Sequence, residues 1–264
     1  MPYVKVRGIE VYYEEHGSGP HHLLLAHGLF GSVSLSTSCA ADIAALGMHV
    51  ISYDARGHGK SGYTGRCQDY YRRALADDMR GLLETLGLTR VSILGSSMGA
   101  GTALMFAIAH PDSVTSLVLR SPPGFGDDAI PARRAMKKLA FLYRYLGSSA
   151  TARVVAMTRG SRAGEMPAVL RAQRAAAMVP AIRGLLIEGP PFPVEDLARI
   201  TAPALILAHQ QDSMHPLTSG ELLEHRLRRP ELHVAADADY WKRHPQELAR
   251  RVVDFAMRAN PAMH

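Results

Sequence analysis

Residues 91–109 constrain the fold of this chain more than any other stretch. Residues 91–94 are a short, largely apolar run typical of a buried strand, and residues 102–109 are an apolar run with helical character. Between them, Gly95 and Gly99 flank Ser97 in the segment Gly-Ser-Ser-Met-Gly. A sharp turn from a strand into a helix needs small residues at these two positions, and its central residue is a typical nucleophile. We therefore predict a strand–turn–helix with a reactive Ser97, and the alternative is a turn without chemistry.

Strand-like and helix-like runs alternate along most of the chain. The strand-like runs are residues 3–7, 10–16, 22–26, 49–53, 91–94, 114–121, 204–208 and 232–235. Helical periodicity is evident at residues 72–86, 102–109 and 245–258. Such alternation predicts an α/β fold in which an eight-stranded, mostly parallel sheet is covered by helices on both faces.

The alternation stops after the sixth predicted strand. Residues 122–200 are rich in Ala, Arg, Leu and Met and predict a helical insertion into a core formed by residues 1–121 and 201–264. The insertion has 12 Lys and Arg against 6 Asp and Glu, a surplus of 6 that equals the net charge of the whole chain. This surplus either steers an acidic substrate or is the solvated outer face of the helices.

Composition narrows the class of protein. With 264 residues, 47% of them hydrophobic and 20% charged, the chain has the make-up of an ordinary globular protein, and its two cysteines form no disulfide framework. The longest uncharged run, residues 91–111, contains three glycines and is better explained by the strand–turn–helix than by a membrane span. No apolar signal region is evident, and no basic motif interleaved with aromatic residues indicates nucleic-acid binding. We expect a cytoplasmic protein that binds neither membrane nor nucleic acid.

The chain resembles the α/β-hydrolase superfamily over nearly its whole length. The likeness rests on His27-Gly28 after the third predicted strand and on residues 54–61, Asp-Ala-Arg-Gly-His-Gly-Lys-Ser, after the fourth. It rests equally on residues 95–99 after the fifth strand and on Asp212 after the seventh. In such sheets ligands bind at the carboxyl ends of the strands, where all four segments are expected. The resemblance implies an enzyme with no cofactor and no metal, in which the helical insertion is a cap or lid.

The resemblance also assigns roles to individual residues. Ser97 is the nucleophile, and a serine here favours attack on an ester, thioester, lactone or amide carbonyl, or cleavage of a carbon–carbon bond next to a carbonyl. The amides of Met98 and Leu29 are the expected donors to the oxyanion. Asp212 is the candidate for the acid that orients the base, and its alternative role is to cap a helix before Pro216.

The base histidine of the superfamily is missing from its usual place after the last strand. Aligning residues 243–245 with the start of the last helix puts Ala238 at the base position, and no histidine lies between His233 and His244. A serine hydroxyl without a base is a poor nucleophile at neutral pH, so this gap bears directly on function.

Three explanations for the gap stay open. His215 lies three residues after Asp212 and is a candidate for a relocated base, although a His-Pro pair that opens a helix is also an ordinary structural element. Alternatively, an alanine has replaced an original histidine. In the third explanation the protein does not use a serine–histidine relay, and Asp237 or Asp239 is the base of a cyclisation or lyase reaction.

The remaining candidates are expected to line the substrate pocket. In the core they are Phe30, Ser96, Asp237, Asp239 and Tyr240. In the insertion they are Phe125, Phe141, Tyr143, Tyr145 and Met178, although aromatic residues and methionines at helical spacing more often belong to a core.

Three functions compete for this pattern. The leading hypothesis is hydrolysis of a small carbonyl substrate without a cofactor. The first alternative is a non-hydrolytic cyclase or lyase on the same fold. The second is a catalytically impaired protein that only binds ligand.

Overall fold

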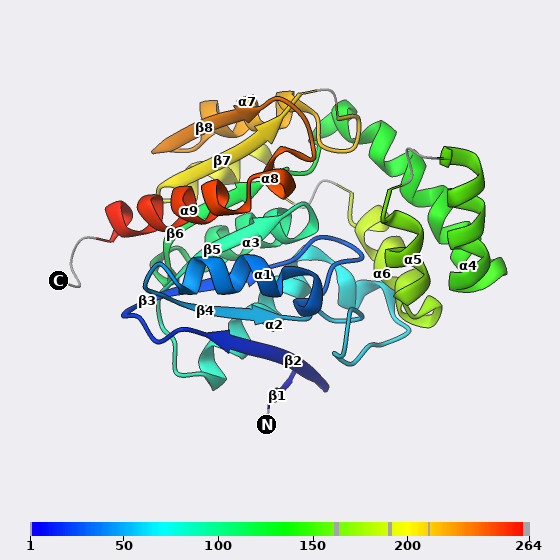
Figure 1. The fold of residues 1–264 in the computed structure, drawn as a ribbon, viewed down its shortest axis with the longest axis horizontal. Helices are drawn as coiled ribbons and strands as arrows, with labels where there is room; N and C mark the ends of the chain where they lie inside the picture. The colour runs from blue at the N-terminus through cyan, green and yellow to red at the C-terminus, as the bar shows by residue number, and fades with distance from the viewer. Residues whose placement is uncertain (1, 161–163, 190–191, 211, 261–264) are drawn as a thin grey trace.

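One sheet of eight strands runs through the described part of the computed structural model, which comprises residues 2–160, 164–189, 192–210 and 212–260 (Figure 1). The strands are β1 Tyr3–Val6, β2 Ile9–His16, β3 His21–Ala26, β4 Met48–Tyr53, β5 Val91–Ser96, β6 Val114–Arg120, β7 Ala204–His209 and β8 Pro230–Ala235. Their order is β1-β2-β4-β3-β5-β6-β7-β8. β2 is antiparallel to β1 and to β4, and all later pairs are parallel. The predicted α/β fold with an eight-stranded, mostly parallel sheet is confirmed.

Helices cover both faces of the sheet (Figure 1). α1 (Val33–Ala44) and α9 (Pro245–Ala259) pack on one face. α2 (Arg72–Thr85), α3 (Met98–Ala109) and α7 (Leu217–Arg226) pack on the other, and the short α8 (Tyr240–Arg243) precedes α9. The parallel connections therefore bring the carboxyl ends of β3 to β8 to one edge of the sheet.

The centre of the sheet is buried on both sides, as expected for parallel strands. Every residue of β5 except Ser96 is buried. Three hydroxyls in this interior satisfy one another, because Ser92 Oγ lies 2.9 Å from Thr115 Oγ1 and Ser116 Oγ donates to Ser92 Oγ at 2.8 Å. These three hydroxyls of β5 and β6 therefore satisfy one another inside the sheet.

The sequence pattern does not predict α1, whose first residues read Val-Ser-Leu-Ser-Thr-Ser. Serine and threonine have low helix propensity, so no local signal marks the helix. Its start is held from a distance, because the carboxylate of Asp54 accepts a hydrogen bond from the Val33 amide at 2.6 Å. Ala40 and Ile43 then pack into the core between the sheet and α9. Tertiary contacts therefore decide this helix.

A group of three helices lies between β6 and β7 and to one side of the sheet (Figure 1). These are α4 (Ile130–Arg159), α5 (Met166–Ala172) and α6 (Ala175–Ile187), all within the range predicted for an insertion. α4 bends at Gly147, whose φ of 72° is readily adopted only by glycine. The three helices enclose a cluster of their own, which Phe30 of the sheet domain joins. Among the helices that the structure describes, none combines the length and the apolar character needed to cross a bilayer.

A buried ion pair attaches the loop after β4 to α2. Arg56 Nε donates to Asp78 Oδ2 at 2.8 Å and its NH2 group donates to Oδ1 at 2.7 Å, and both side chains are only 3% exposed. This loop carries the Asp-Ala-Arg-Gly-His-Gly-Lys-Ser segment, so the pair holds one wall of the sheet edge in place.

Replacing Asp78 by alanine should destabilise the protein by about 3–5 kcal/mol, because the Arg56 guanidinium would stay buried without a partner. Asp77→Ala is the matched control on the same helix, since its carboxylate is 36% exposed and its ion pairs with Arg7 and Arg73 span 3.9 and 3.5 Å. We expect that control to lose less than about 1 kcal/mol. Urea-induced unfolding measures both, and equal midpoints for the two variants would contradict the role given to the buried pair.

Candidate active site

Ser97 occupies the sharp turn between β5 and α3. Its φ is 51°, a positive value that residues with a side chain rarely adopt. The two flanking glycines make room for the turn, because a Cβ on Gly95 would lie 2.5 Å from the Gly99 oxygen and a Cβ on Gly99 would lie 2.1 Å from the Ala26 oxygen. The Ser97 amide also donates to the Arg120 carbonyl at 3.0 Å. The strained residue is therefore held by its neighbours on both sides.

Two backbone amides lie beside this turn. Met98 is the first residue of α3, so its N–H has no partner within the helix and lies at the positive end of the helix dipole. Leu29 follows Gly28, at which an added Cβ would lie 3.4 Å from Ser97 Cβ. Within the described part of the chain, no acceptor is recorded for either amide. Both residues line the same cavity as Ser97, so an anion there can accept both hydrogen bonds.

His27 explains why the loop after β3 holds its shape. Its Nδ1 lies 2.8 Å from the Gly28 carbonyl, and its Nε2 accepts from the Ala55 amide at 2.9 Å. A neutral imidazole satisfies both bonds at once, with the proton on Nδ1. Burial lowers the pKa of His27, which keeps the ring neutral. This histidine ties the loop of Leu29 to the loop after β4.

An imidazole and a carboxylate complete a chain of hydrogen bonds to the serine. His215 Nε2 lies 2.8 Å from Ser97 Oγ, and His215 Nδ1 lies 2.8 Å from Asp212 Oδ2. An ionised carboxylate can only accept, so the ring proton belongs on Nδ1 and Nε2 accepts from the Ser97 hydroxyl. The structure thus brings the three residues predicted for catalysis into one line.

The local turn after β7 fixes this pair. Asp212 and His215 are three residues apart in the loop that leads to α7, and the Met214 amide donates to Asp212 Oδ1 at 2.7 Å. Burial alone would raise the pKa of Asp212, but the hydrogen bonds from His215 and from the Met214 amide outweigh burial and lower this pKa to about 2. Asp212 is therefore ionised at neutral pH, as an acid that orients a base has to be.

A cavity of about 920 Å³ lies between this edge of the sheet and the insertion. Ser97, His215, Met98, Leu29 and Phe30 line it from the sheet side. Helix α4 supplies much of the opposite wall. Ser97 therefore faces a cavity large enough for a small organic substrate.

The charged residues of the cavity wall are all cations. They are Arg72, Arg133, Arg134, Lys138 and Arg159, and no Asp or Glu belongs to the wall in the part of the chain that the structure describes. Arg72 is neutralised by Glu188 at 2.9 Å, whereas no ion pair is recorded for Arg134, Lys138 or Arg159 among the described residues. Part of the basic surplus therefore faces the cavity, and other cations such as Lys137 and Arg144 lie on the outer side of α4 around a separate groove.

Four residues predicted for the pocket wall lie elsewhere. Ser96 projects to the opposite face of the sheet from Gly95, because side chains alternate along a strand, and its Oγ accepts from Arg120 Nε at 2.9 Å. Asp237 pairs with Arg243 at 2.7 Å, and Tyr240 donates to Glu247 at 2.9 Å.

Asp239 completes this correction. It precedes the short helix α8, and its carbonyl accepts hydrogen bonds from amides of that helix. Of the five predicted wall residues in the core, Phe30 alone is among those that line the cavity within the described chain.

The aromatic candidates in the insertion divide in the same way. Phe125 lines the cavity. Tyr143 and Met178 are buried inside the cluster of the three helices, and Phe141 and Tyr145 are 61% and 69% exposed on the outer side. Helical spacing does not show which face of a helix meets the cavity. The assignment of Phe141, Tyr143, Tyr145 and Met178 to the pocket wall is therefore corrected.

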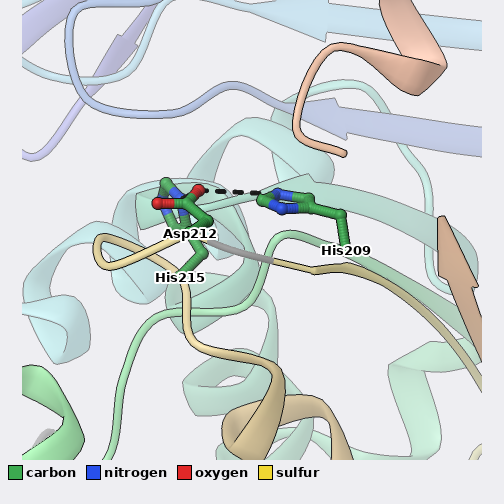
Figure 2. A group of neighbouring side chains, drawn as sticks. All are labelled: His209, Asp212 and His215. Atoms are coloured by element: carbon green, nitrogen blue, oxygen red, sulfur yellow. Dashed lines mark hydrogen bonds and ion pairs between the residues drawn. The ribbon is translucent and has the colours of Figure 1, made fainter. Parts of the chain in front are cut away.

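His209 is a site residue that the sequence analysis did not select. It is the last residue of β7, its side chain is 2% exposed, and its Nε2 lies 3.6 Å from Asp212 Oδ2 and 3.0 Å from Ser121 Oγ. Figure 2 shows the Asp212 carboxylate next to the rings of both His209 and His215. The available signal was a histidine at the end of a buried strand, immediately before the loop of the predicted acid.

Comparison with known proteins shows what the chain is similar to. The family model described as "alpha/beta hydrolase fold" matches residues 21–252. A curated relative, the 2-hydroxy-6-oxononadienedioate/2-hydroxy-6-oxononatrienedioate hydrolase of Burkholderia vietnamiensis, is 26% identical over 277 aligned positions, which span 95% of this chain and 92% of that protein. Two solved structures share the fold. An enol-lactonase from Burkholderia xenovorans LB400 has a TM-score of 0.81 and 22% sequence identity, and the match covers 96% of this chain and 99% of that one. A thermophilic esterase from Thermogutta terrifontis has a TM-score of 0.80 and 21% sequence identity, and the match covers 98% of this chain and 97% of that one.

A fluorophosphonate should form a covalent adduct at Ser97, because the hydroxyl faces the cavity and hydrogen-bonds to an imidazole. Intact-mass measurement followed by peptide mapping checks this. His215→Ala should slow the labelling by at least about a hundredfold. Ser96→Ala is the matched control and should keep the adduct at Ser97, since Ser96 lies outside the cavity wall. A folded protein that is not labelled, or an adduct at another serine, would refute the assignment.

Proposed function

This chain belongs to the α/β-hydrolase fold family and is a hydrolase, and from that premise we propose that it cleaves small acidic carbonyl compounds through a Ser97 nucleophile. The observation that carries the proposal is the continuous line from Asp212 through His215 to the Ser97 hydroxyl, with two links of 2.8 Å, at the wall of an enclosed cavity. In this proposal His215 replaces the histidine that the superfamily carries after its last strand.

The first half of the reaction follows from the hydrogen bonds. Ser97 Oγ attacks the substrate carbonyl carbon while its proton passes to His215 Nε2. The imidazolium that forms is stabilised by the ionised Asp212, which also keeps the ring in the orientation that faces the serine. The carbonyl oxygen gains negative charge and accepts hydrogen bonds from the amides of Met98 and Leu29. His215 then gives its proton to the leaving group, and an acyl group remains on Ser97.

The second half repeats the same proton transfers with water. His215 Nε2 takes a proton from a water molecule that attacks the acyl carbon, and returns it to Ser97 Oγ as the acid product leaves. No cofactor is needed to balance either half. The leaving group is an alcohol or enol for an ester or lactone, and a stabilised carbanion that takes up a proton for a carbon–carbon bond next to a carbonyl.

The substrate class follows from the charge of the cavity. Arg134, Lys138 and Arg159 line it without a recorded carboxylate partner in the described chain, so a substrate carboxylate would find complementary charge there. Curated relatives are named as hydrolases of dienedioates, compounds with a carboxylate at each end. We therefore place this chain with hydrolases of carboxylate-bearing esters, lactones or vinylogous ketones.

The helical insertion acts in this proposal as a lid that sets substrate size. Residues of α4 line the cavity opposite Ser97, and Gln173 Nε2 donates to the Phe30 carbonyl at 3.0 Å, which attaches the insertion to the loop of the oxyanion donors. The boundaries predicted from the sequence, residues 1–121 and 201–264 for the core and 122–200 for the lid, are the ones we propose.

The cyclase or lyase alternative required Asp237 or Asp239 as a base in the cavity. Asp237 is held by Arg243, and neither Asp237 nor Asp239 lines the cavity in the described structure. The binding-only alternative rested on the absence of a base. His215 Nε2, however, lies 2.8 Å from Ser97 Oγ. Hydrolysis therefore has the stronger support.

Steady-state hydrolysis of mono-4-nitrophenyl succinate tests the relay. Ser97→Ala should lower kcat by at least about a thousandfold, and His215→Ala by at least about a hundredfold. His233→Ala is the matched histidine control, because His233 lies in β8 away from the cavity wall, and its kcat should stay near the wild-type value. Full activity of Ser97→Ala would end the serine mechanism, and full activity of His215→Ala would return that residue to a structural role.

A charge-selectivity experiment tests the substrate class. The double variant Arg134→Gln/Lys138→Gln should raise KM for mono-4-nitrophenyl succinate by about tenfold, since each exposed charge contact is worth on the order of 1 kcal/mol. KM for the neutral 4-nitrophenyl butyrate should stay unchanged. Lys137→Gln/Arg144→Gln removes the same charge from the outer side of the same helix and should change neither value. Equal effects of the two double variants would show that only net charge matters, and no effect of either would remove the acidic substrate.

A further inference from the structure

We propose that His209, Asp212 and His215 form a binding site for a divalent transition metal such as Zn²⁺, and that metal bound there switches the hydrolase off. The inhibitory part rests on the proposed function of His215 as the base. The binding part rests on the geometry of the three side chains alone.

His209 is the buried histidine that the proposed relay does not use. Its ring lies against the carboxylate of the relay, with Nε2 3.6 Å from Asp212 Oδ2 and 3.0 Å from Ser121 Oγ, whose hydroxyl has to turn its proton away when this nitrogen binds a metal. A second imidazole next to the acid adds nothing to the proton transfers, but it adds a third ligand to the cluster.

The three side chains converge on one point. One ligand atom from each lies within 4.8 Å of the others, and Figure 2 shows the carboxylate next to both rings. Zinc bonds of about 2.0–2.2 Å in a tetrahedron keep their ligand atoms roughly 3.3–3.6 Å apart. Of the separations from Asp212 Oδ2, the 3.6 Å to His209 Nε2 matches that spacing, and the 2.8 Å to His215 Nδ1 differs from it by an amount that side-chain rotation supplies. Two imidazoles and a carboxylate are also a ligand set that zinc commonly adopts, with a water in the fourth position.

Charge and access suit a dication. The carboxylate of Asp212 belongs to the cluster and that of Asp237 lies near His209, although Arg243 neutralises part of the Asp237 charge. No Lys or Arg makes a recorded ion pair with Asp212 in the described residues. The side chains of Asp212 and His215 are 16% and 22% exposed, so an ion can approach from their side while His209 closes the rear.

Metal binding and catalysis require opposite tautomers of His215. In the relay Nδ1 carries the proton and donates to Asp212, and Nε2 has the free lone pair that accepts the Ser97 proton. A metal on Nδ1 takes the lone pair of that nitrogen, so the ring proton moves to Nε2 and points at Ser97 Oγ. The serine then faces a donor in place of a base. The two states exclude each other, and the metal inhibits.

Cobalt binding to the full chain measures the site independently of catalysis. Chelator-treated Ser97→Ala should take up about one Co²⁺ and show the intense visible bands of four-coordinate cobalt, since Ser97 is not a ligand. Adding His209→Gln should weaken Co²⁺ and Zn²⁺ binding by at least about tenfold. The matched control is His22→Gln/His49→Gln, which removes another close imidazole pair, with Nδ1 atoms 2.8 Å apart, on the far side of the sheet domain from the cavity wall. It should leave the bands unchanged.

Inhibition is measured in the chain with Ser97 intact. ZnCl₂ should abolish ester hydrolysis, and EDTA should restore it. Half inhibition is defined for each protein against its own metal-free rate. The zinc concentration that gives half inhibition should be at least about tenfold higher for His209→Gln than for the unmodified chain. Absence of tetrahedral cobalt bands, or bands that survive His209→Gln, would overturn the site. Cobalt binding without inhibition would overturn the tautomer argument, and a rate that rises with zinc would replace inhibition by metal-assisted hydrolysis. A protein that binds cobalt but hydrolyses nothing would contradict the proposed function alone.

Discussion

The contact between the first turn of α3 and the end of β3 is the constraint on which the site depends. A Cβ on Gly99 would lie 2.1 Å from the carbonyl oxygen of Ala26, so no other residue fits without moving one of the two elements. With Gly99 packed this closely against Ala26, the backbone at Ser97 bends to a φ of 51°. The Met98 amide then lies beside the loop of Leu29. A conformation of this kind costs on the order of 1–3 kcal/mol, which the packing of β5 and α3 has to offset.

The proposed placement of base and acid in one loop changes what the rest of the fold has to do. In the arrangement that the resemblance implies, two loops after different strands must dock to bring histidine and carboxylate together. Here Asp212 and His215 are three residues apart, and the Met214 amide closes the turn between them at 2.7 Å. In this proposal the loop after β8 has no catalytic residue to supply, and its residues make local contacts such as the pair between Asp237 and Arg243. Alanine at position 238 is consistent with this proposal.

The parts of the site that follow from local backbone rules could be predicted from sequence. The glycines around Ser97 and the position of Met98 after it need only the geometry of a strand–turn–helix. His215 stayed one of three explanations, because a spacing of three residues shows that two side chains can meet but not that the loop points them at the serine. His209 was missed because its role depends on register within β7. The inner faces of the lid helices were not predictable either, since helical spacing is the same for a face that meets the cavity and one that meets solvent.

The charge of the cavity also bears on the energy of the proposed proton transfer. Cations on α4 line the same cavity as His215, and in the proposed mechanism the imidazolium that forms when His215 takes the Ser97 proton is held by Asp212. In the proposed function, a substrate carboxylate seated among Arg134 and Lys138 would add negative charge to the cavity in which the imidazolium forms. A neutral substrate adds no such charge, so the enzyme would discriminate in the chemical step as well as in binding. In the proposed function the cations on the inner side of the insertion therefore take part in substrate selection, because substrate and relay share one cavity.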